Sequence, residues 1–143
     1  MIILDTNVLS EVMRSTPDVG VLSWLQGQPR SALFTTTITQ GELFYGLRLL
    51  DDGQRKVKLF EAIQSVFLID MVGKVLSFDT DAADAYGLIA SERKRAGRPI
   101  SQFDAMIAAI TLSRGARLAT RNAKDFADCG ISVIDPWHIS GKK

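Results

Sequence analysis

Apolar and polar residues follow two different patterns along the chain, and each pattern predicts one kind of element. Short apolar runs predict strands, because a strand buried in a parallel sheet is apolar on both faces. Longer segments in which apolar residues recur every three or four positions predict helices. The apolar runs are Ile2–Leu4, Ala32–Thr36, Val75–Phe78, Arg117–Ala119 and Ser132–Ile134. Because strands alternate with helices, we expect an α/β fold with a parallel sheet covered on both faces.

Residues that cap or break helices set the limits of the helical segments. The predicted helices run from Pro17 and Asp18 to about Gly27, from Thr37 or Thr39 to about Leu50, from about Gln54 to Ile69, from Thr80 to before Gly97, and from after Ser101 to Gly115. Two of them, about 38–50 and 54–69, follow each other without a strand between them. They predict a projecting helical hairpin, which is a candidate surface for a dimer or another partner.

Composition limits the classes of protein that the chain can belong to. Its 143 residues, 46% of them hydrophobic, suffice for one domain with its own core, and we treat 1–143 as a single domain. A single cysteine, Cys129, excludes an internal disulfide and fits a reducing cytoplasm. The apolar start is too short for a signal peptide, and no stretch approaches the roughly 18 apolar residues of a membrane span. We therefore expect a soluble, cytoplasmic protein without a membrane partner.

The net charge of +1 does not by itself indicate a nucleic-acid partner. Basic residues are nevertheless clustered, and each cluster taken alone is typical of a solvated helix face. The clusters are Arg55, Lys56 and Lys58; Arg93, Lys94, Arg95 and Arg98; and Arg114, Arg117 and Arg121.

Two groups of polar residues directly follow predicted strands. Asp5 comes one residue after the first strand, and Asn122 and Asp125 follow the strand that ends near Ala119. Ligands of open parallel sheets bind outside the carboxyl ends of the strands. These residues therefore belong to the edge at which a site is expected.

Two further acids lie inside predicted helices. Glu42 shares a helix face with Ile38, Tyr45 and Leu49, so it lies on an apolar stripe where a carboxylate needs a partner. Asp104 lies near the start of its helix, on a face with small and apolar residues, and can point into a cleft.

Each of these acids also has a purely structural interpretation. Asp5 or Thr6 can serve as a helix N-cap, and Glu42 can pair with Arg48 or another cation. Asp104 can be favoured by the helix dipole, and Asp125 can be a turn or cap residue. None of these explains why four such positions converge on one edge. Convergent carboxylates repel one another unless a cation is bound, and oxygen ligands without nearby His or Cys suit Mg²⁺ or Mn²⁺. The pattern favours metal-dependent hydrolysis of a phosphodiester.

Five segments, in this order and spacing, carry a resemblance to a known family. They are IILDTNVLSE at 2–11, TTTITQGELFYG at 35–46, SQFDAMIAAI at 101–110, ATRNAKDF at 119–126 and DPWH at 135–138. Together they make the chain resemble a PIN-domain ribonuclease of the VapC toxin type, close to the FitB-like branch.

The resemblance implies a three-layer α/β/α PIN fold with a central parallel sheet of about four or five strands. It implies a Mg²⁺ (or Mn²⁺) site of Asp5, Glu42 and Asp104, with the hydroxyl of Thr6 bonded to substrate or to metal-bound water. It further implies an endoribonuclease toxin that is usually a homodimer and is inhibited by a cognate VapB-like or FitA-like antitoxin. Such a complex binds operator DNA only through the antitoxin.

Asn122 departs from the pattern, because some relatives carry an acid there. We expect Asp125, or a water on Asn122, to complete a second, weaker metal position. For RNA contacts we expect Arg121 nearest the site, with Arg93, Lys94, Arg95 and Arg98 further out.

Other classes fit the residues less well. A dehalogenase-type phosphatase needs Asp-x-Asp, but position 7 is Asn. A receiver domain needs an early acidic pair, and the pair Asp51–Asp52 falls in a helix–helix turn. Two alternatives stay open: a housekeeping or DNA-cleaving PIN nuclease, and a PIN module that binds but does not cut.

We expect His138 to lie in a tail that packs on the fold rather than to act as a base.

Overall fold

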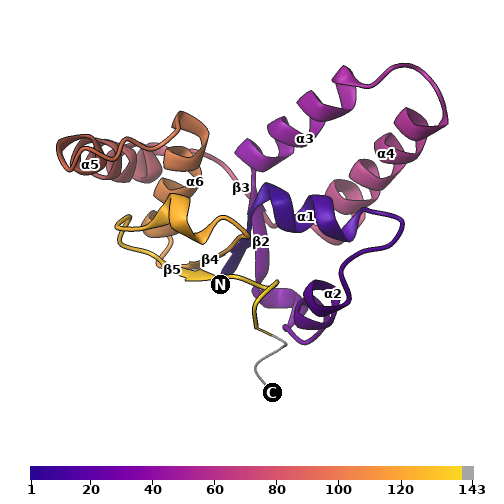
Figure 1. Ribbon diagram of the computed structural model, residues 1–143, viewed down its shortest axis with the longest axis horizontal. Coiled ribbons are helices and arrows are strands. Elements are labelled where there is room, and N and C mark those ends of the chain that lie inside the picture. Colours follow the sequence, from indigo (N-terminus) through magenta and orange to yellow (C-terminus); the bar gives the residue numbers. More distant parts are fainter. Residues whose placement is uncertain (140–143) are drawn as a thin grey trace.

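The protein forms a single five-stranded parallel sheet with helices on both of its faces (Figure 1). The structure is a computed structural model that describes residues 1–139. The strands are β1 (Ile2–Leu4), β2 (Leu33–Thr36), β3 (Val75–Leu76), β4 (Arg117–Ala119) and β5 (Ser132–Ile134), in the spatial order β3-β2-β1-β4-β5. All five predicted strands are confirmed, with β2 and β3 slightly shorter than expected.

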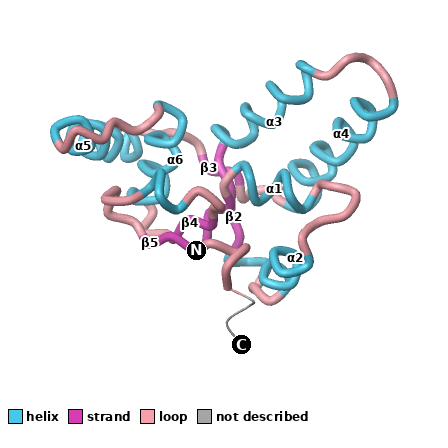
Figure 2. Tube along the Cα trace, viewed as in Figure 1, coloured by secondary structure: helices cyan, strands magenta, loops and turns pink. Residues whose placement is uncertain are grey.

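The helices come in pairs between strands: α1 (Thr6–Val12), α2 (Val19–Gln26), α3 (Thr37–Leu49), α4 (Gln54–Ser65), α5 (Thr80–Arg95) and α6 (Gln102–Ser113). The segment predicted as one helix over 54–69 is α-helical only to Ser65 and continues as a π-helical turn, Val66–Asp70. The hairpin of α3 and α4 is confirmed, and its connecting loop lies at the end far from the sheet (Figure 2).

None of the helices within residues 1–139 is long and apolar enough to cross a lipid bilayer.

Strand β1 divides the core into two layers, because successive side chains of a strand point to opposite faces. Ile3 packs on the side of α5 and α6, with residues such as Ile107 and Ala108. Ile2 and Leu4 pack on the other side, where α1 to α4 contribute residues such as Leu43. These two cores confirm the predicted three-layer α/β/α arrangement.

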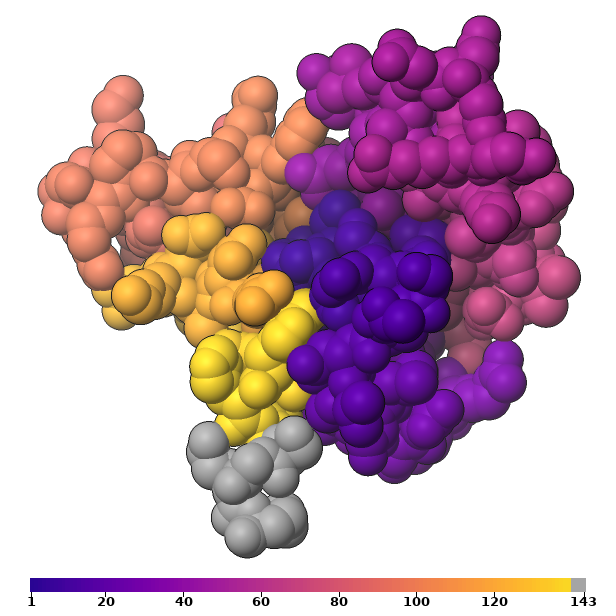
Figure 3. Space-filling view, turned by 45° about the vertical axis from the view of Figure 1, so that its right-hand side comes forward, coloured from indigo at the N-terminus to yellow at the C-terminus, as the bar shows by residue number. Residues whose placement is uncertain are grey.

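The carboxyl ends of β1 and β4 lie side by side at the centre of the sheet. From β1 the chain continues to β2 on one side, whereas β4 pairs with β1 on the other. The backbone amide of Asp5 donates to the carbonyl of Ala119 at 3.0 Å and ties the two ends together. Figure 3 shows the start of the chain (indigo) between the helical hairpin (magenta) and the C-terminal segment (yellow). Reversal of strand order between two neighbouring parallel strands creates the crevice in which such sheets bind ligands.

Candidate active site

A polar cavity of about 500 Å³ opens at the carboxyl ends of β1 and β4. It is lined by the three acids expected from the sequence, which come from three separate elements: Asp5 from the β1–α1 junction, Glu42 from α3 and Asp104 from α6. Thr6 and Asn122 also line it. We call this space the acidic cavity. The structure thus brings together acids up to 99 positions apart in the sequence.

Asp5 is almost fully buried, with 4% of its surface exposed, and has two roles. Its Oδ1 accepts a hydrogen bond from the amide of Thr6 at 2.8 Å, so it caps α1, as its simpler interpretation proposed. Its Oδ2 accepts from the hydroxyl of Thr120 at 2.8 Å. The pKa of Asp5 is raised to about 6. Burial is the main cause and the charges of Asp104 and Glu42 add to it, whereas the hydrogen bonds from Thr120 and Thr6 lower the pKa. The cap and the cavity therefore share one carboxylate.

Glu42 is held by a hydroxyl rather than by a cation. Thr6 Oγ1 donates to Glu42 Oε1 at 2.5 Å and lies 3.0 Å from Thr39 Oγ1. Thr6 thus links the first turn of α1 to α3, and the alternative in which Arg48 pairs with Glu42 is not what the structure contains. The link fixes the orientation of the Glu42 carboxylate at the cavity wall.

The face of α3 that carries Glu42, Tyr45 and Leu49 is not the face that packs on the core. Tyr45 and Leu49 are 68% and 66% exposed, and the buried face of α3 consists of Thr39, Leu43 and Leu47. Both faces carry apolar residues, so the pattern alone does not say which one packs on the sheet. Glu42 lies at the border between the two faces.

Asp104 lies half-buried in the first turn of α6, where Ser101 caps the helix and accepts from the amide of Asp104 at 3.2 Å. Burial raises the pKa of Asp104, and the charge of Asp125 raises it further, while Ser101 and Arg93 lower it. Asp125 is exposed in a 3-10 turn, Ala123–Phe126, and acts on Asp104 by its charge without lining the cavity. Asn122 does line it.

Arg93 is the one predicted RNA-contacting residue that the structure places inside the fold. It is 7% exposed, its Nε donates to the carbonyl of Arg98 at 2.7 Å, and its Nη1 donates to the carbonyls of Asp125 and Ala127, both at 3.0 Å. A guanidinium that is buried and bonded in this way is not available to a phosphate, so the prediction for Arg93 is wrong. Its task is to fix the segment that carries Asp125.

Two residues to which the sequence reasoning gave no role complete the site. Asn7 Nδ2 donates to Thr120 Oγ1 at 3.1 Å, and Asn7 Oδ1 accepts from the backbone amide of Arg121 at 3.0 Å. Thr120 Oγ1 also accepts from the amide of Asn122 at 3.1 Å. The signal for both was their position: each is a small polar residue within three positions of a buried strand's carboxyl end.

The donor set of the acidic cavity suits a hard divalent cation. Asp5, Glu42 and Asp104 offer carboxylate oxygens only. Burial, and to a smaller extent the charges of Asp104 and Glu42, raise the pKa of Asp5, and a bound cation would favour its charged form. Within residues 1–139 no three Asp, Glu, His or Cys side chains already stand close enough together to hold an ion. Carboxylate oxygens are nevertheless the ligands that hard divalent cations prefer, so chemically the residues fit Mg²⁺ or Mn²⁺.

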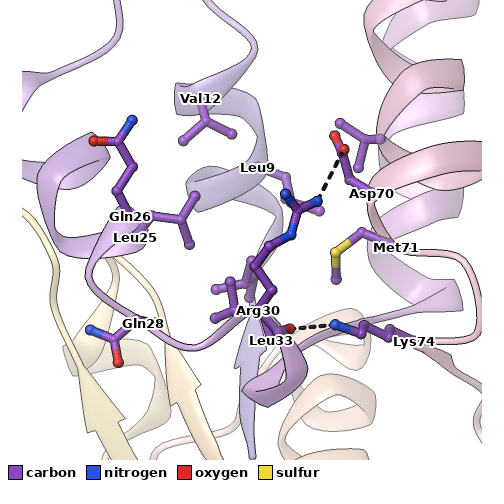
Figure 4. Close-up of a pocket in the computed structure, with 12 residues that line it drawn as sticks. Leu9, Val12, Leu25, Gln26, Gln28, Arg30, Leu33, Asp70, Met71 and Lys74 are labelled. Carbon is purple, nitrogen blue, oxygen red and sulfur yellow. Dashed lines mark hydrogen bonds and ion pairs between the residues drawn. The ribbon is translucent and has the colours of Figure 1, made fainter.

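A second cavity, of about 400 Å³, lies on the opposite side of α1 and is mainly apolar (Figure 4). Leu9, Leu25 and Met71 line it. At its edge Arg30 Nη2 lies 3.7 Å from Asp70 Oδ1, and Lys74 donates to the carbonyl of Arg30. We call it the apolar cavity. It has no group of convergent carboxylates.

Comparison with known proteins identifies the family. The PIN domain family matches residues 2–131. The chain belongs to the PIN-domain family. Among its relatives, the VapC ribonuclease Y4jK of Sinorhizobium fredii is 36% identical over 96% of this chain and 98% of its own length. Toxin FitB of Neisseria gonorrhoeae is 36% identical over 96% and 99%. The structure of FitAB bound to an IR36 DNA fragment matches the PIN domain with a TM-score of 0.91 and 34% identity over 100% of both chains, which confirms the predicted PIN fold.

Proposed function

We propose that this PIN domain is a metal-dependent endoribonuclease and the toxin of a toxin–antitoxin pair. The observation that carries the proposal is the convergence of Asp5, Glu42 and Asp104 in one cavity at the carboxyl ends of β1 and β4. Burial, together with the charges of Asp104 and Glu42, raises the pKa of Asp5, as is common for a carboxylate at a functional site. Relatives of similar length carry the names VapC ribonuclease and toxin FitB, which supports RNA as the substrate.

The proposed cofactor is Mg²⁺ or Mn²⁺, held by Asp5 and Asp104, with Glu42 as a third ligand or as the group that orients the attacking water. When bound, the ion supplies charge neutralisation and lowers the pKa of a coordinated water. The hydroxyl of Thr6 holds Oε1 of Glu42, so Oε2 would be free to accept a proton from the attacking water. Asn122 and the charge of Asp125 favour a second, weaker cation position.

The proposed reaction is direct hydrolysis. The water oxygen would bond to the phosphorus in line with the bond between the phosphorus and the 3′ oxygen, and that bond would break. The attacking water would give up a proton, and the leaving 3′ oxygen would take up a proton from solvent. The products are a 5′-phosphate and a 3′-hydroxyl. Exposed Lys94, Arg95 and Arg98, together with Arg121 at the cavity, are the proposed contacts to the RNA backbone.

The proposed partners are a second copy of the chain and a cognate antitoxin of the VapB or FitA kind. Tyr45 and Leu49 of α3 and Phe103 of α6 are 68%, 66% and 52% exposed, and large exposed apolar side chains that lie together favour a protein interface. We propose this face for the homodimer. Operator DNA would be bound through the antitoxin, as the FitAB complex with DNA suggests. Cys129 is a free, buried thiol, which suits the proposed cytoplasmic location.

The test is the substitution Asp104→Asn, which keeps the size of the side chain and removes one carboxylate charge. In Mg²⁺ we expect cleavage of a fluorescent single-stranded RNA to fall by at least about a hundredfold. Asp84→Asn on α5 removes the same charge from an exposed position outside the acidic cavity and should leave the rate unchanged. Far-ultraviolet circular dichroism of both variants checks the fold.

Each other outcome of this test contradicts a defined part of the proposal. Full activity of Asp104→Asn would remove the residue from the site. Binding of Mn²⁺ and RNA by the parent without turnover would indicate a module that binds but does not cut. Faster cleavage of single-stranded DNA than of RNA of the same sequence would indicate a DNA nuclease.

A further inference from the structure

Arg121 is held at the wall of the acidic cavity from two sides. Its backbone amide donates to Asn7 Oδ1 at 3.0 Å, and its guanidinium carbon lies 4.9 Å from the centre of the Trp137 ring. Both side chains line the cavity that contains Asp5 and Asp104. An arginine fixed at backbone and side chain has lost most of its conformational freedom before a ligand arrives.

Trp137 is itself anchored. Its backbone amide donates to Asp135 Oδ1 at 3.0 Å, the His138 ring lies 2.7 Å from Asp135 Oδ2, and Pro136 is buried. The Trp137 ring packs against the core layer that contains Leu4 and Leu9. The C-terminal tail therefore packs on the fold, as expected from the sequence, but it also brings an aromatic ring to the cavity.

The stacking contact explains why Arg121 does not neutralise the acids beside it. A flexible arginine next to several carboxylates would be expected to fold onto them as an ion pair. Within residues 1–139, Arg121 instead stacks on Trp137 and forms no ion pair with Asp5, Glu42 or Asp104. Its N–H groups stay available to an anion that approaches the cavity.

We propose that Arg121 and Trp137 form a binding subsite for the nucleotide next to the scissile bond: Arg121 pairs with its phosphate, and Trp137 positions Arg121. The inference rests on the proposed function and adds the substrate contact to it. Phosphates approaching a cavity of three carboxylates are repelled, and a fixed guanidinium at the wall offsets that repulsion where the chain must pass. Single-stranded RNA is commonly held by arginine and aromatic side chains together.

The binding test uses a fluorescein-labelled 12-nucleotide single-stranded RNA of mixed sequence and chains that carry Asp104→Asn to stop cleavage. We expect Arg121→Gln to raise Kd about tenfold and Trp137→Leu about three- to fivefold, because the first removes the charged hydrogen bond and the second removes only its support. Trp137→Phe keeps an aromatic face and should stay within about twofold. The double variant Arg121→Gln/Trp137→Leu should resemble Arg121→Gln alone, because Trp137 acts through Arg121.

In the active chain the same substitutions should raise KM and leave kcat within about twofold, which a general loss of structure would not do. Intrinsic fluorescence gives a second readout, since the chain has two tryptophans. With Trp24→Phe, Trp137 is the only reporter, and its emission should change when RNA is added. With Trp137→Phe, the partly buried Trp24 should give no change.

The outcomes separate this inference from the proposed function. RNA cleavage with an unchanged KM in Trp137→Leu, or additive effects in the double variant, would overturn the subsite and leave the nuclease intact. A chain that neither binds nor cuts RNA would overturn both. A response of Trp137 to an antitoxin peptide but not to RNA would assign the subsite to the protein partner instead.

Discussion

The acidic cavity and the apolar cavity are built on opposite faces of one short helix. Thr6, Asn7 and Ser10 of α1 line the acidic cavity, whereas Leu9 and Val12 of the same helix line the apolar one. The two spaces have similar volumes, about 500 and 400 Å³. The difference between them is therefore not size but the state of their polar groups.

In the apolar cavity the charged side chains at the edge each have a partner: Arg30 pairs with Asp70, and Lys74 donates to the carbonyl of Arg30. In the acidic cavity burial raises the pKa of Asp5 to about 6, with a smaller contribution from the charges of Asp104 and Glu42. Apolar lining is the usual sign of a ligand pocket, but groups whose charge the protein leaves uncompensated are the stronger sign of chemistry. We therefore expect one face of α1 to matter mainly for stability and the other for the proposed function, and the next three changes test that division.

The largest effect on stability is expected from Leu9→Ala in the apolar cavity. Leu9 is 3% exposed and belongs to the core, so its truncation should lower the free energy of unfolding by about 2–5 kcal/mol. The rate of RNA cleavage per folded molecule should stay unchanged. Urea denaturation and an activity titration measure the two quantities. Ser10→Ala, on the other face of α1, is the stability control and should cost less than about 0.5 kcal/mol. A loss of activity beyond the loss of folded protein would break the division.

The next effect is a gain of stability from Asp5→Asn without metal. Because burial raises the pKa of Asp5 from 3.8 to about 6, the folded chain binds this proton more tightly than the unfolded chain. Wild-type stability therefore falls as the pH rises from about 4 to about 6, and the full penalty of up to about 3 kcal/mol is present above that range. Asp5→Asn lacks this penalty, so its free energy of unfolding should exceed that of wild type at pH 7. The difference should disappear below pH 4.

Urea denaturation of wild type and Asp5→Asn in EDTA, at pH 4 and pH 7, measures this difference. Comparing each protein with itself at the two pH values cancels any change that does not depend on pH, such as an altered cap of α1. Asp84→Asn serves as the control with the same change in charge. Equal pH dependence in wild type and Asp5→Asn would contradict the raised pKa.

The smallest effect is expected from Arg30→Gln at the edge of the apolar cavity. The side chains of Arg30 and Asp70 are 81% and 50% exposed and 3.7 Å apart, so water and salt screen their attraction. Thermal denaturation should show a change in the free energy of unfolding of no more than about 0.5 kcal/mol, and Asp70→Asn should have the same small effect. A loss above about 1.5 kcal/mol would show that this pair holds the cavity closed.

Local sequence was enough for the strands and for most helix limits. The strand Ile2–Leu4 is apolar because both its faces are buried, and Ser101 and Asp18 cap their helices through hydrogen bonds to backbone amides that the sequence already suggested. The π-helical turn at Val66–Asp70 was not predictable in the same way, because its apolar residues fit an α-helix equally well.

The site was predictable in its acids but not in the groups that hold them. Asp5, Glu42 and Asp104 were found from strand ends and helix position. The bonds from Thr6 to Glu42 and from Thr120 to Asp5 span 36 and 115 residues. Contacts over such separations produce no periodic pattern in the sequence, so these hydroxyl partners could be identified only from the folded structure.

The sequence by itself determined the order of elements, the edge of the sheet where ligands bind and the acids that reach it, because these depend on short-range patterns and on the geometry of parallel strands. Tertiary structure alone decided which face of α3 is buried. It also decided that Arg93 is buried and bonded to backbone carbonyls, and that Trp137 contacts Arg121 at the cavity. Burial and partnership depend on which surfaces meet, and that is fixed only when the whole chain packs.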